Sequence, residues 1–182
     1  MKLIKTFTTK KNKEVQIVEP SMDFLDEVLR YANKFAKEDT FLTFDPGKEI
    51  SREDEEKWLE AQISGIEKGR SFLVWAVYDG RIIGSVDIHR GGNVREWHIG
   101  TIGLMVDADF RGEGLGRLLL EFIIEKAKEM GIRTAVLGVF STNDTARSLY
   151  EKVGFVKYGV LPDGLYHKNK FADHIYMYKR LI

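Results

Sequence analysis

Strand patterns recur along the chain. Alternating apolar and polar residues indicate strands with one buried face, because successive side chains point to opposite sides of a sheet. Short continuous apolar runs between turn residues indicate strands buried on both faces. Together these patterns predict strands at residues 3–8, 14–18, 72–78, 82–89, 97–106, 134–140, 155–160 and 175–181. We expect the last two to be joined through Pro162-Asp163-Gly164, whose residue types favour turns.

Four stretches between these strands carry apolar residues at the helical period instead. Ser21, Ser51 and Asn143 are placed to cap three of them, since their side chains accept hydrogen bonds from first-turn amides. The predicted helices cover residues 24–36, 52–68, 114–130 and 144–153. The buried stripe of the second is expected to consist of Trp58, Leu59, Ile63 and Ile66. Between residues 37 and 50 the periodicity lapses, which predicts a loop.

The order of these elements predicts the fold class. Residues 72–106 are expected to form an antiparallel meander with a tight Asp79-Gly80 turn. The next helix and the apolar strand after it form a strand-helix-strand crossover, which makes its two strands parallel. We therefore expect an α/β (α+β) fold with a mixed, mostly antiparallel, twisted central sheet of about seven strands, a parallel pair in its middle and about four flanking helices. A single domain is expected to span residues 1–182.

Composition narrows the class of protein. Hydrophobic residues make up 43% of the 182 residues, enough for one core. Lys plus Arg and Asp plus Glu both total 28, so no net charge favours nucleic acid or an anionic membrane. Cysteine is absent, which excludes disulfides, thiolate metal sites and a cysteine nucleophile. No apolar run suits a membrane span or a signal peptide, so we expect a cytoplasmic protein.

The stretch at residues 102–120 joins an apolar strand to an apolar helix through a glycine-rich turn. A helix N-terminus gathers backbone amides that lack internal acceptors, and its dipole favours an anion. Gly112, Gly114 and Gly116 leave room for phosphate oxygens near those amides. Arginines on both sides of the turn add positive charge. The stretch therefore predicts a phosphate-binding turn.

Spacing distinguishes among the glycine-rich phosphate loops. A P-loop is excluded because no Lys-Ser or Lys-Thr pair closes a G-x-x-x-x-G frame. A dinucleotide fingerprint fails because Arg117 or Leu119 stands where the third glycine is required. The pattern that fits is Arg111-x-x-Gly114-x-Gly116. It resembles the pyrophosphate loop of the GNAT superfamily of N-acetyltransferases, which bind acetyl-CoA.

A second motif strengthens this resemblance. It is similar to the GNAT pattern Asn-x-x-Ala-x-x-Leu-Tyr-x-Lys-x-Gly-Phe, matched by Asn143, Ala146, Leu149, Tyr150, Lys152, Gly154 and Phe155. The two motifs occur in the family's order, and the resemblance runs from about Val15 to the C-terminus. It implies the GNAT fold, in which the parallel strands splay apart and the pantetheine arm of acetyl-CoA enters between them.

The resemblance also implies which residues contact acetyl-CoA. Backbone amides at the end of the strand before the turn would bind the arm and the acetyl carbonyl, and the turn would bind the pyrophosphate. The implied contact residues are Leu104, Met105, Val106, Arg111, Gly112, Glu113, Gly114, Leu115, Gly116, Arg117, Asn143, Arg147 and Tyr150. No metal is expected.

Tyr150 is the expected catalytic residue, since in many family members the tyrosine at this motif position donates a hydrogen bond or proton to the departing thiolate. The general base is less clearly marked, because Gly138 stands where several relatives carry a glutamate. The candidates are Glu96 and His98, with Asp87 and His89 as alternatives. Direct attack by an amine that is already deprotonated in solution is the remaining alternative.

The acceptor is expected to be a primary amine, because the C-terminal stretch is most similar to the branch that acetylates ribosomal-protein N-termini, polyamines and small amines. Residues expected to contact it are Glu38, Asp39, Phe41, Phe44, Asp87 and Tyr166.

The predicted function is an acetyl-CoA-dependent N-acetyltransferase acting by direct attack in a ternary complex. The alternative is a catalytically silent acyl-CoA-binding sensor or interaction domain. Expected partners are a small-molecule or peptide amine and a second copy in a homodimer, without nucleic acid or membrane.

Overall fold

The secondary structure follows the predicted order of elements. The computed structural model describes residues 2–38, 41 and 48–182. Its strands are β1 (Leu3–Thr8), β2 (Glu14–Val18), β3 (Ser71–Tyr78), β4 (Arg81–Arg90), β5 (Ile99–Val106), β6 (Thr134–Phe140), β7 (Val156–His167) and β8 (Lys170–Arg180). Its α-helices are α1 (Leu25–Glu38), α2 (Arg52–Glu67), α3 (Leu115–Glu129) and α4 (Asp144–Val153). Short 3-10 helices at Met22–Phe24, Val94–Glu96 and Ala108–Phe110 precede α1, β5 and α3.

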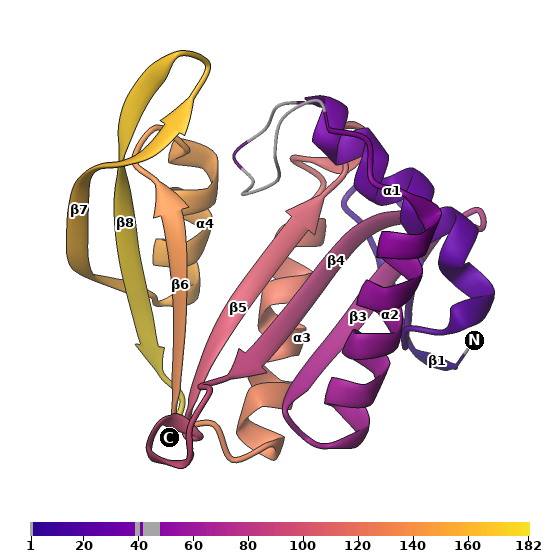
Figure 1. Cartoon of the computed structure of the whole chain (residues 1–182), viewed down its shortest axis with the longest axis horizontal. Helices are drawn as coiled ribbons and strands as arrows, with labels where there is room; N and C mark the ends of the chain where they lie inside the picture. The colour runs from indigo at the N-terminus through magenta and orange to yellow at the C-terminus, as the bar shows by residue number, and fades with distance from the viewer. Residues whose placement is uncertain (1, 39–40, 42–47) are drawn as a thin grey trace.

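The eight strands of the described chain form a sheet in the order β1-β2-β3-β4-β5-β6-β8-β7 (Figure 1). Neighbours pair antiparallel except β5 and β6, which are parallel. The predicted fold class is confirmed. The sheet has eight strands where about seven were expected, because both short N-terminal segments pair into it.

Helices cover both faces of the sheet. In Figure 1, α1 and α2 lie in front of β3 and β4, whereas α3 lies behind β4 and β5 and α4 lies behind β6. Behind the sheet, Leu119 and Ile123 of α3 are fully buried in the larger hydrophobic core. In front, Phe35 of α1 and Leu59 of α2 pack with Trp75 of β3 in a second core. The sheet is therefore buried on two sides around its centre.

β5 and β6 pair over a short distance and then diverge. Their parallel register joins Ile99 to Thr134, Gly100 to Ala135 and Thr101 to Val136. β4 instead follows β5 as far as Val106. Figure 1 shows the two parallel strands opening away from their paired end. Within the described residues, β5 therefore has an edge with no strand partner from Ile102 onward.

The β7–β8 hairpin differs from the predicted connection. The chain turns at Lys168 and Asn169, whose φ angles of 50° and 61° are those of a two-residue hairpin turn. Pro162-Asp163-Gly164 lies inside β7, where the pairing register with β8 shifts. The prediction that these three residues join the strands is wrong, because they distort a strand without ending it.

α2 buries a narrower face than its sequence predicts. Leu59 is fully buried, with Ile63 and Ile66 partly buried beside it, whereas Trp58 is 41% exposed. Glu55, one turn before Leu59, is buried in place of an apolar residue, and burial raises its pKa. The predicted stripe is therefore wrong at Trp58, because α2 packs mainly on β3 and α1 and turns this residue outward.

Candidate active site

The free edge of β5 presents backbone amides at alternate residues. The amide of Asp107, just after β5, donates to the carbonyl oxygen of Ile83 at 2.9 Å, which identifies the amides that face β4. Because strand amides alternate between the two edges, the amide of Met105 also faces β4. Those of Leu104 and Val106 face the side from which β6 has diverged. Two of the three expected amide donors are thus directed to the open edge.

The glycine-rich turn follows β5 and leads into α3. Gly114 is the N-cap residue of α3, with a φ of 88° that residues with side chains rarely adopt. Among the described residues no side chain caps this helix, and its first turn starts with a 3.1 Å bond from the Leu118 amide to the Gly114 carbonyl oxygen. The amides of Leu115, Gly116 and Arg117 therefore point to where an anion would bind.

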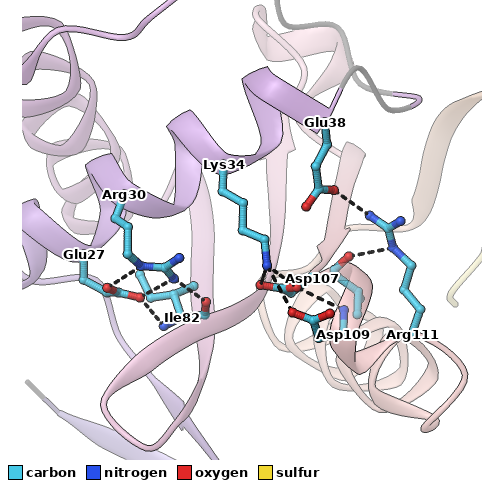
Figure 2. Close-up of polar contacts among 9 residues, drawn as sticks. Glu27, Arg30, Lys34, Glu38, Ile82, Asp107, Asp109 and Arg111 are labelled. Carbon is cyan, nitrogen blue, oxygen red and sulfur yellow. Dashed lines mark hydrogen bonds and ion pairs between the residues drawn. The ribbon is translucent and has the colours of Figure 1, made fainter.

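The two arginines of the turn lie in different surroundings. Arg111 turns back over the end of β5, where its Nε donates to the carbonyl oxygen of Val106 at 2.9 Å and a terminal nitrogen lies 3.5 Å from Glu38 (Figure 2). Arg117 is exposed on α3 and pairs with Glu121 at 2.8 Å. Arg111 therefore ties the turn to β5 and α1, while Arg117 remains beside the first-turn amides.

Charged residues of α1 hold the end of β5 in place (Figure 2). Lys34 donates to both oxygens of the buried Asp107 carboxylate, at 2.7 and 2.6 Å. One turn earlier, Arg30 pairs with Glu27 at 2.6 Å and donates to the carbonyl oxygen of Ile82 at 3.2 Å. These contacts join α1 to β4 and to the residue after β5, so they position the strand end from which the turn starts.

Glu113 points toward the β1–β2 hairpin. Its side chain is fully buried and accepts hydrogen bonds from Thr9 Oγ1 at 3.2 Å and Lys13 Nζ at 3.0 Å, with Lys11 Nζ at 3.1 Å. Its carbonyl oxygen accepts from the amide of Lys10 at 3.0 Å. The hydrogen bond from Lys13 lowers the pKa of Glu113. Glu113 therefore anchors the turn to the β1–β2 hairpin.

The second motif forms α4, behind the diverging strands. The Asn143 side chain accepts from the Ala146 amide at 3.1 Å and so caps the helix, and Arg147 donates to the carbonyl oxygen of Ser141 at 2.9 Å. Tyr150 is buried, with Phe155 edge-on at 6.0 Å between ring centroids. Burial raises the pKa of Tyr150 to about 12. The tyrosine is therefore protonated at neutral pH.

Of the residues expected to contact the amine substrate, Asp87 and Phe41 lie near the diverging strands, and Glu38 ends α1. Asp87 of β4 lies over Gly103 of β5, and its Oδ2 is 3.1 Å from Nε2 of His89. Phe41 packs against Phe140, the last residue of β6, at 5.4 Å between ring centroids. Glu38 ends α1 beside Arg111. Asp39 and Phe44 lie outside the described residues.

Three other predicted residues lie elsewhere. Glu96 and His98 precede β5, at the end where it pairs with β6, and the carbonyl oxygen of His98 accepts from the Thr134 amide at 3.2 Å. Tyr166 is 62% exposed near the tip of the β7–β8 hairpin and donates to Asn169 at 3.2 Å. The structure does not bring Glu96 or His98 together with the open edge, because the strands diverge toward the opposite end of β5.

Two features of this region are not apparent from the sequence patterns. The first is the group of N-terminal side chains around Glu113, whose only sequence signal is a lysine-rich turn at residues 10–13. The second is His174 of β8, whose ring lies over Gly138 of β6. Both depend on pairs of residues that are distant in sequence, so no local spacing indicates them.

Neither a metal-binding cluster nor a membrane-spanning helix is found among the described residues. The described residues contain no group of three or more His, Cys, Asp or Glu side chains placed to hold a metal ion. None of the helices in the described ranges is long and apolar enough to cross a membrane.

Comparisons with known proteins agree with this arrangement. The model of the acetyltransferase (GNAT) family matches residues 33–155. A GNAT-family acetyltransferase from Streptococcus pneumoniae has a TM-score of 0.82 at 32% identity, over 91% of this chain and 99% of that one. An acetyltransferase from Salmonella typhimurium, whose structure includes its cofactor acetyl-CoA, has a TM-score of 0.80 over 92% of this chain and 94% of that one; at 18% identity it shows the fold alone.

Matches to curated relatives are more local. The ribosomal protein bS18-alanine N-acetyltransferase of Escherichia coli K12 is 42% identical over 52 residues, which are 29% of this chain. The match spans 35% of that relative's length. The similarity is therefore to a segment of that relative, and it does not identify the substrate of this chain.

Glu113→Gln should loosen the turn by removing the charge that its lysine partners contact. A carboxylate whose pKa is lowered on folding stabilises the protein above its ordinary pKa and loses that effect as pH falls through the lowered value. We therefore expect the variant to unfold at lower urea concentration than wild type at pH 7, and the difference to shrink below about pH 4.

The matched control for this prediction is Glu121→Gln, which removes an exposed pair on α3 and should leave the urea midpoint nearly unchanged. A Glu113→Gln difference that stays constant from pH 7 to about pH 3 would contradict the charge-based role.

Proposed function

The chain belongs to the GNAT family of acetyltransferases, and from that premise we propose that it transfers an acetyl group from acetyl-CoA to a primary amine. One observation carries the proposal: the open edge of β5 runs directly into a turn whose helix, α3, has no side-chain cap among the described residues. Strand amides and helix amides thus follow one another along a path that an extended arm ending in phosphates could occupy.

The proposed cofactor contacts divide between these two parts. The amides of Leu115, Gly116 and Arg117 would bind the pyrophosphate, since the first turn of a helix favours anions. The Lys10 side chain lies beside Gly114 and adds a cation there. The amides of Leu104 and Val106 would pair with the pantetheine arm and the acetyl carbonyl. An amide directed at that oxygen stabilises the negative charge that develops on it during attack.

Tyr150 is proposed to assist the leaving group. Attack by the amine forms the N–C bond and breaks the C–S bond, which leaves a thiolate. Thiols ionise near pH 8.5, so a phenol with a pKa of about 12 stabilises the thiolate chiefly as a hydrogen-bond donor, and water completes its protonation. The hydroxyl of this buried tyrosine suits the function because it stays protonated throughout the neutral range.

The acceptor is proposed to enter on the face of the sheet that carries α1 and α2. Asp87 lies on that face beside the diverging strands, and its carboxylate can bind an ammonium group. The relative named for acetylating ribosomal protein bS18 supports a peptide N-terminus as acceptor, and the sequence resemblance adds small amines. The cytoplasmic location and a homodimer stay predictions.

A second candidate function is a silent acyl-CoA-binding module. Gly138 favours it, because the glutamate that several relatives carry at this position is missing. Release of thiol from acetyl-CoA, measured with peptides, polyamines, aminoglycosides and amino acids as acceptors, separates the two functions. Transfer to any of them excludes the silent module.

CoA should raise the melting temperature, because a ligand that binds only the native state adds about 2.7 kcal/mol at a hundredfold excess over its Kd. Pantetheine without phosphates should raise it less. Gly114→Val should abolish most of the CoA-induced shift, because it places a branched side chain against the Lys10 side chain, beside the first-turn amides of α3.

The matched control is Gly131→Val at the other end of α3, where a φ of 76° imposes similar backbone strain. This variant should melt lower but keep its CoA-induced shift. Equal CoA shifts in the two variants would show that the turn is not the phosphate site.

Tyr150→Phe should separate chemistry from binding. The ring and its packing on Phe155 remain, so the variant should melt near wild type and bind acetyl-CoA almost normally. Its kcat should fall about 10²-fold, with a similar fall in kcat/KM, because the hydroxyl acts only in the transition state. A rise in KM at unchanged kcat would instead make Tyr150 a binding residue.

A further inference from the structure

Two glycines face each other across the divergence of β5 and β6. Gly103 and Gly138 each lie two residues beyond the last β5–β6 pair, which joins Thr101 to Val136. Both face the side of the sheet that carries α1 and α2, because Met105 packs in the core on that side whereas Leu137 packs in the core on the other. At this level neither diverging strand places a side chain in front of the sheet.

A titratable side chain from the next strand outward lies over each glycine. Asp87 Oδ1 of β4 is 2.5 Å from the position that a Cβ atom at residue 103 would take. On the other side, Nε2 of His174 occupies the position of a Cβ atom at residue 138. A carboxylate and an imidazole therefore flank the diverging strands at the same level and on the same face.

His174 is partly buried in surroundings of low charge. Its ring lies against Tyr176 at 4.3 Å between centroids, and its Cβ lies beside Gly164 of β7. No ring-nitrogen hydrogen bond or ion pair of His174 is found among residues 2–38, 41 and 48–182. Burial lowers the pKa of His174, so the imidazole is neutral at pH 7 and able to accept a proton.

Among the residues that the structure describes, few other titratable groups face this imidazole. Tyr176 is the neighbour on its own strand, and β6 contributes the uncharged Gly138 and Phe140. On β7, the His167 ring packs on Phe140. Asp173 lies on the opposite face of β8 by strand alternation, and its carboxylate accepts from the Asp163 amide. Across the divergence stand Asp87 and His89.

We propose that His174 is the general base of the transfer, and that it accepts a proton from an ammonium group held across the diverging strands by Asp87. This rests on the proposed function and names the residue that serves in place of the missing glutamate. Gly138 is then required, because a side chain at residue 138 would displace the imidazole from this position.

The ammonium nitrogen loses two protons during the transfer. Nε2 of His174 takes one proton from R–NH₃⁺, and the free amine attacks the acetyl carbonyl carbon. When the tetrahedral intermediate collapses, the C–S bond breaks, the nitrogen loses a second proton to water, and the thiolate gains a proton. The His174 imidazolium then releases its proton to solvent. The products are R–NH–acetyl, CoA thiol and one net proton, and no oxidant or reductant is involved.

The test is the pH dependence of kcat/KM for His174→Gln, with an active peptide as acceptor. At pH 6.5 to 7 the variant should be slower by about 10²-fold or more, the contribution of a positioned base. The deficit should shrink by pH 9, because an α-amino group with a pKa of about 8 is then deprotonated in solution. CoA should still raise its melting temperature as it does for wild type.

Two further variants keep the test specific. His98→Gln changes the histidine at the paired end of β5 and should keep the wild-type pH profile. Gly138→Ala retains His174 but displaces its ring, so it should reproduce the His174→Gln deficit with an unchanged CoA shift.

An unchanged His174→Gln profile in an active enzyme would overturn the assignment, as would a deficit that is the same at pH 7 and pH 9. Loss of the CoA shift in His174→Gln would make the residue structural and would equally overturn it. If wild type binds CoA but acetylates no amine, the proposed function itself fails, and this assignment fails with it.

Discussion

The site depends on backbone pairing that stops in the middle of a sheet. β5 and β6 share three residue pairs and then diverge, while β4 stays paired with β5 to its end. Backbone amides at the centre of a sheet normally find partners, and leaving them unpaired away from water is costly. The amides of Leu104 and Val106 therefore lack a strand partner. An extended ligand with its own amide and carbonyl groups could form the hydrogen bonds that a neighbouring strand would otherwise form.

Contacts from the N-terminal part of the chain hold this divergence in place. Lys34 of α1 binds the buried Asp107 directly after β5, and Arg111 is bonded to the last carbonyl of β5. Glu113 ties the turn to the β1–β2 hairpin through the lysines of that hairpin. Partly buried ion pairs of this kind contribute modestly to stability, but breaking one leaves a buried charge unpaired. They restrict where the strand end and the turn can lie, which a site built from backbone amides requires.

The chemistry that depends on local spacing was predictable from the sequence, and the chemistry that depends on distant partners was not. The turn at Gly114 and the α4 cap at Asn143 follow from residues within a few positions of each other. The burial of Glu113 and the place of His174 over Gly138 depend on strand pairing and hairpin packing, which no short window contains. Trp58 occupies a helical position at which the apolar spacing predicts burial, but its side chain lies outside the face of α2 that packs on the sheet and is exposed. That residues 1–182 form one domain stays a prediction, as do the acceptor contacts.

The amide protons of β5 can show whether the open edge of this strand binds the ligand. In a CoA titration followed by amide NMR and hydrogen exchange, the amides of Leu104 and Val106 should shift downfield and exchange more slowly as the arm pairs with them. The amide of Met105, already facing β4, should keep its slow exchange in both states. Saturating CoA that alters the α3 first-turn amides but leaves Leu104 and Val106 unchanged would contradict the claim that the open edge of β5 binds the ligand.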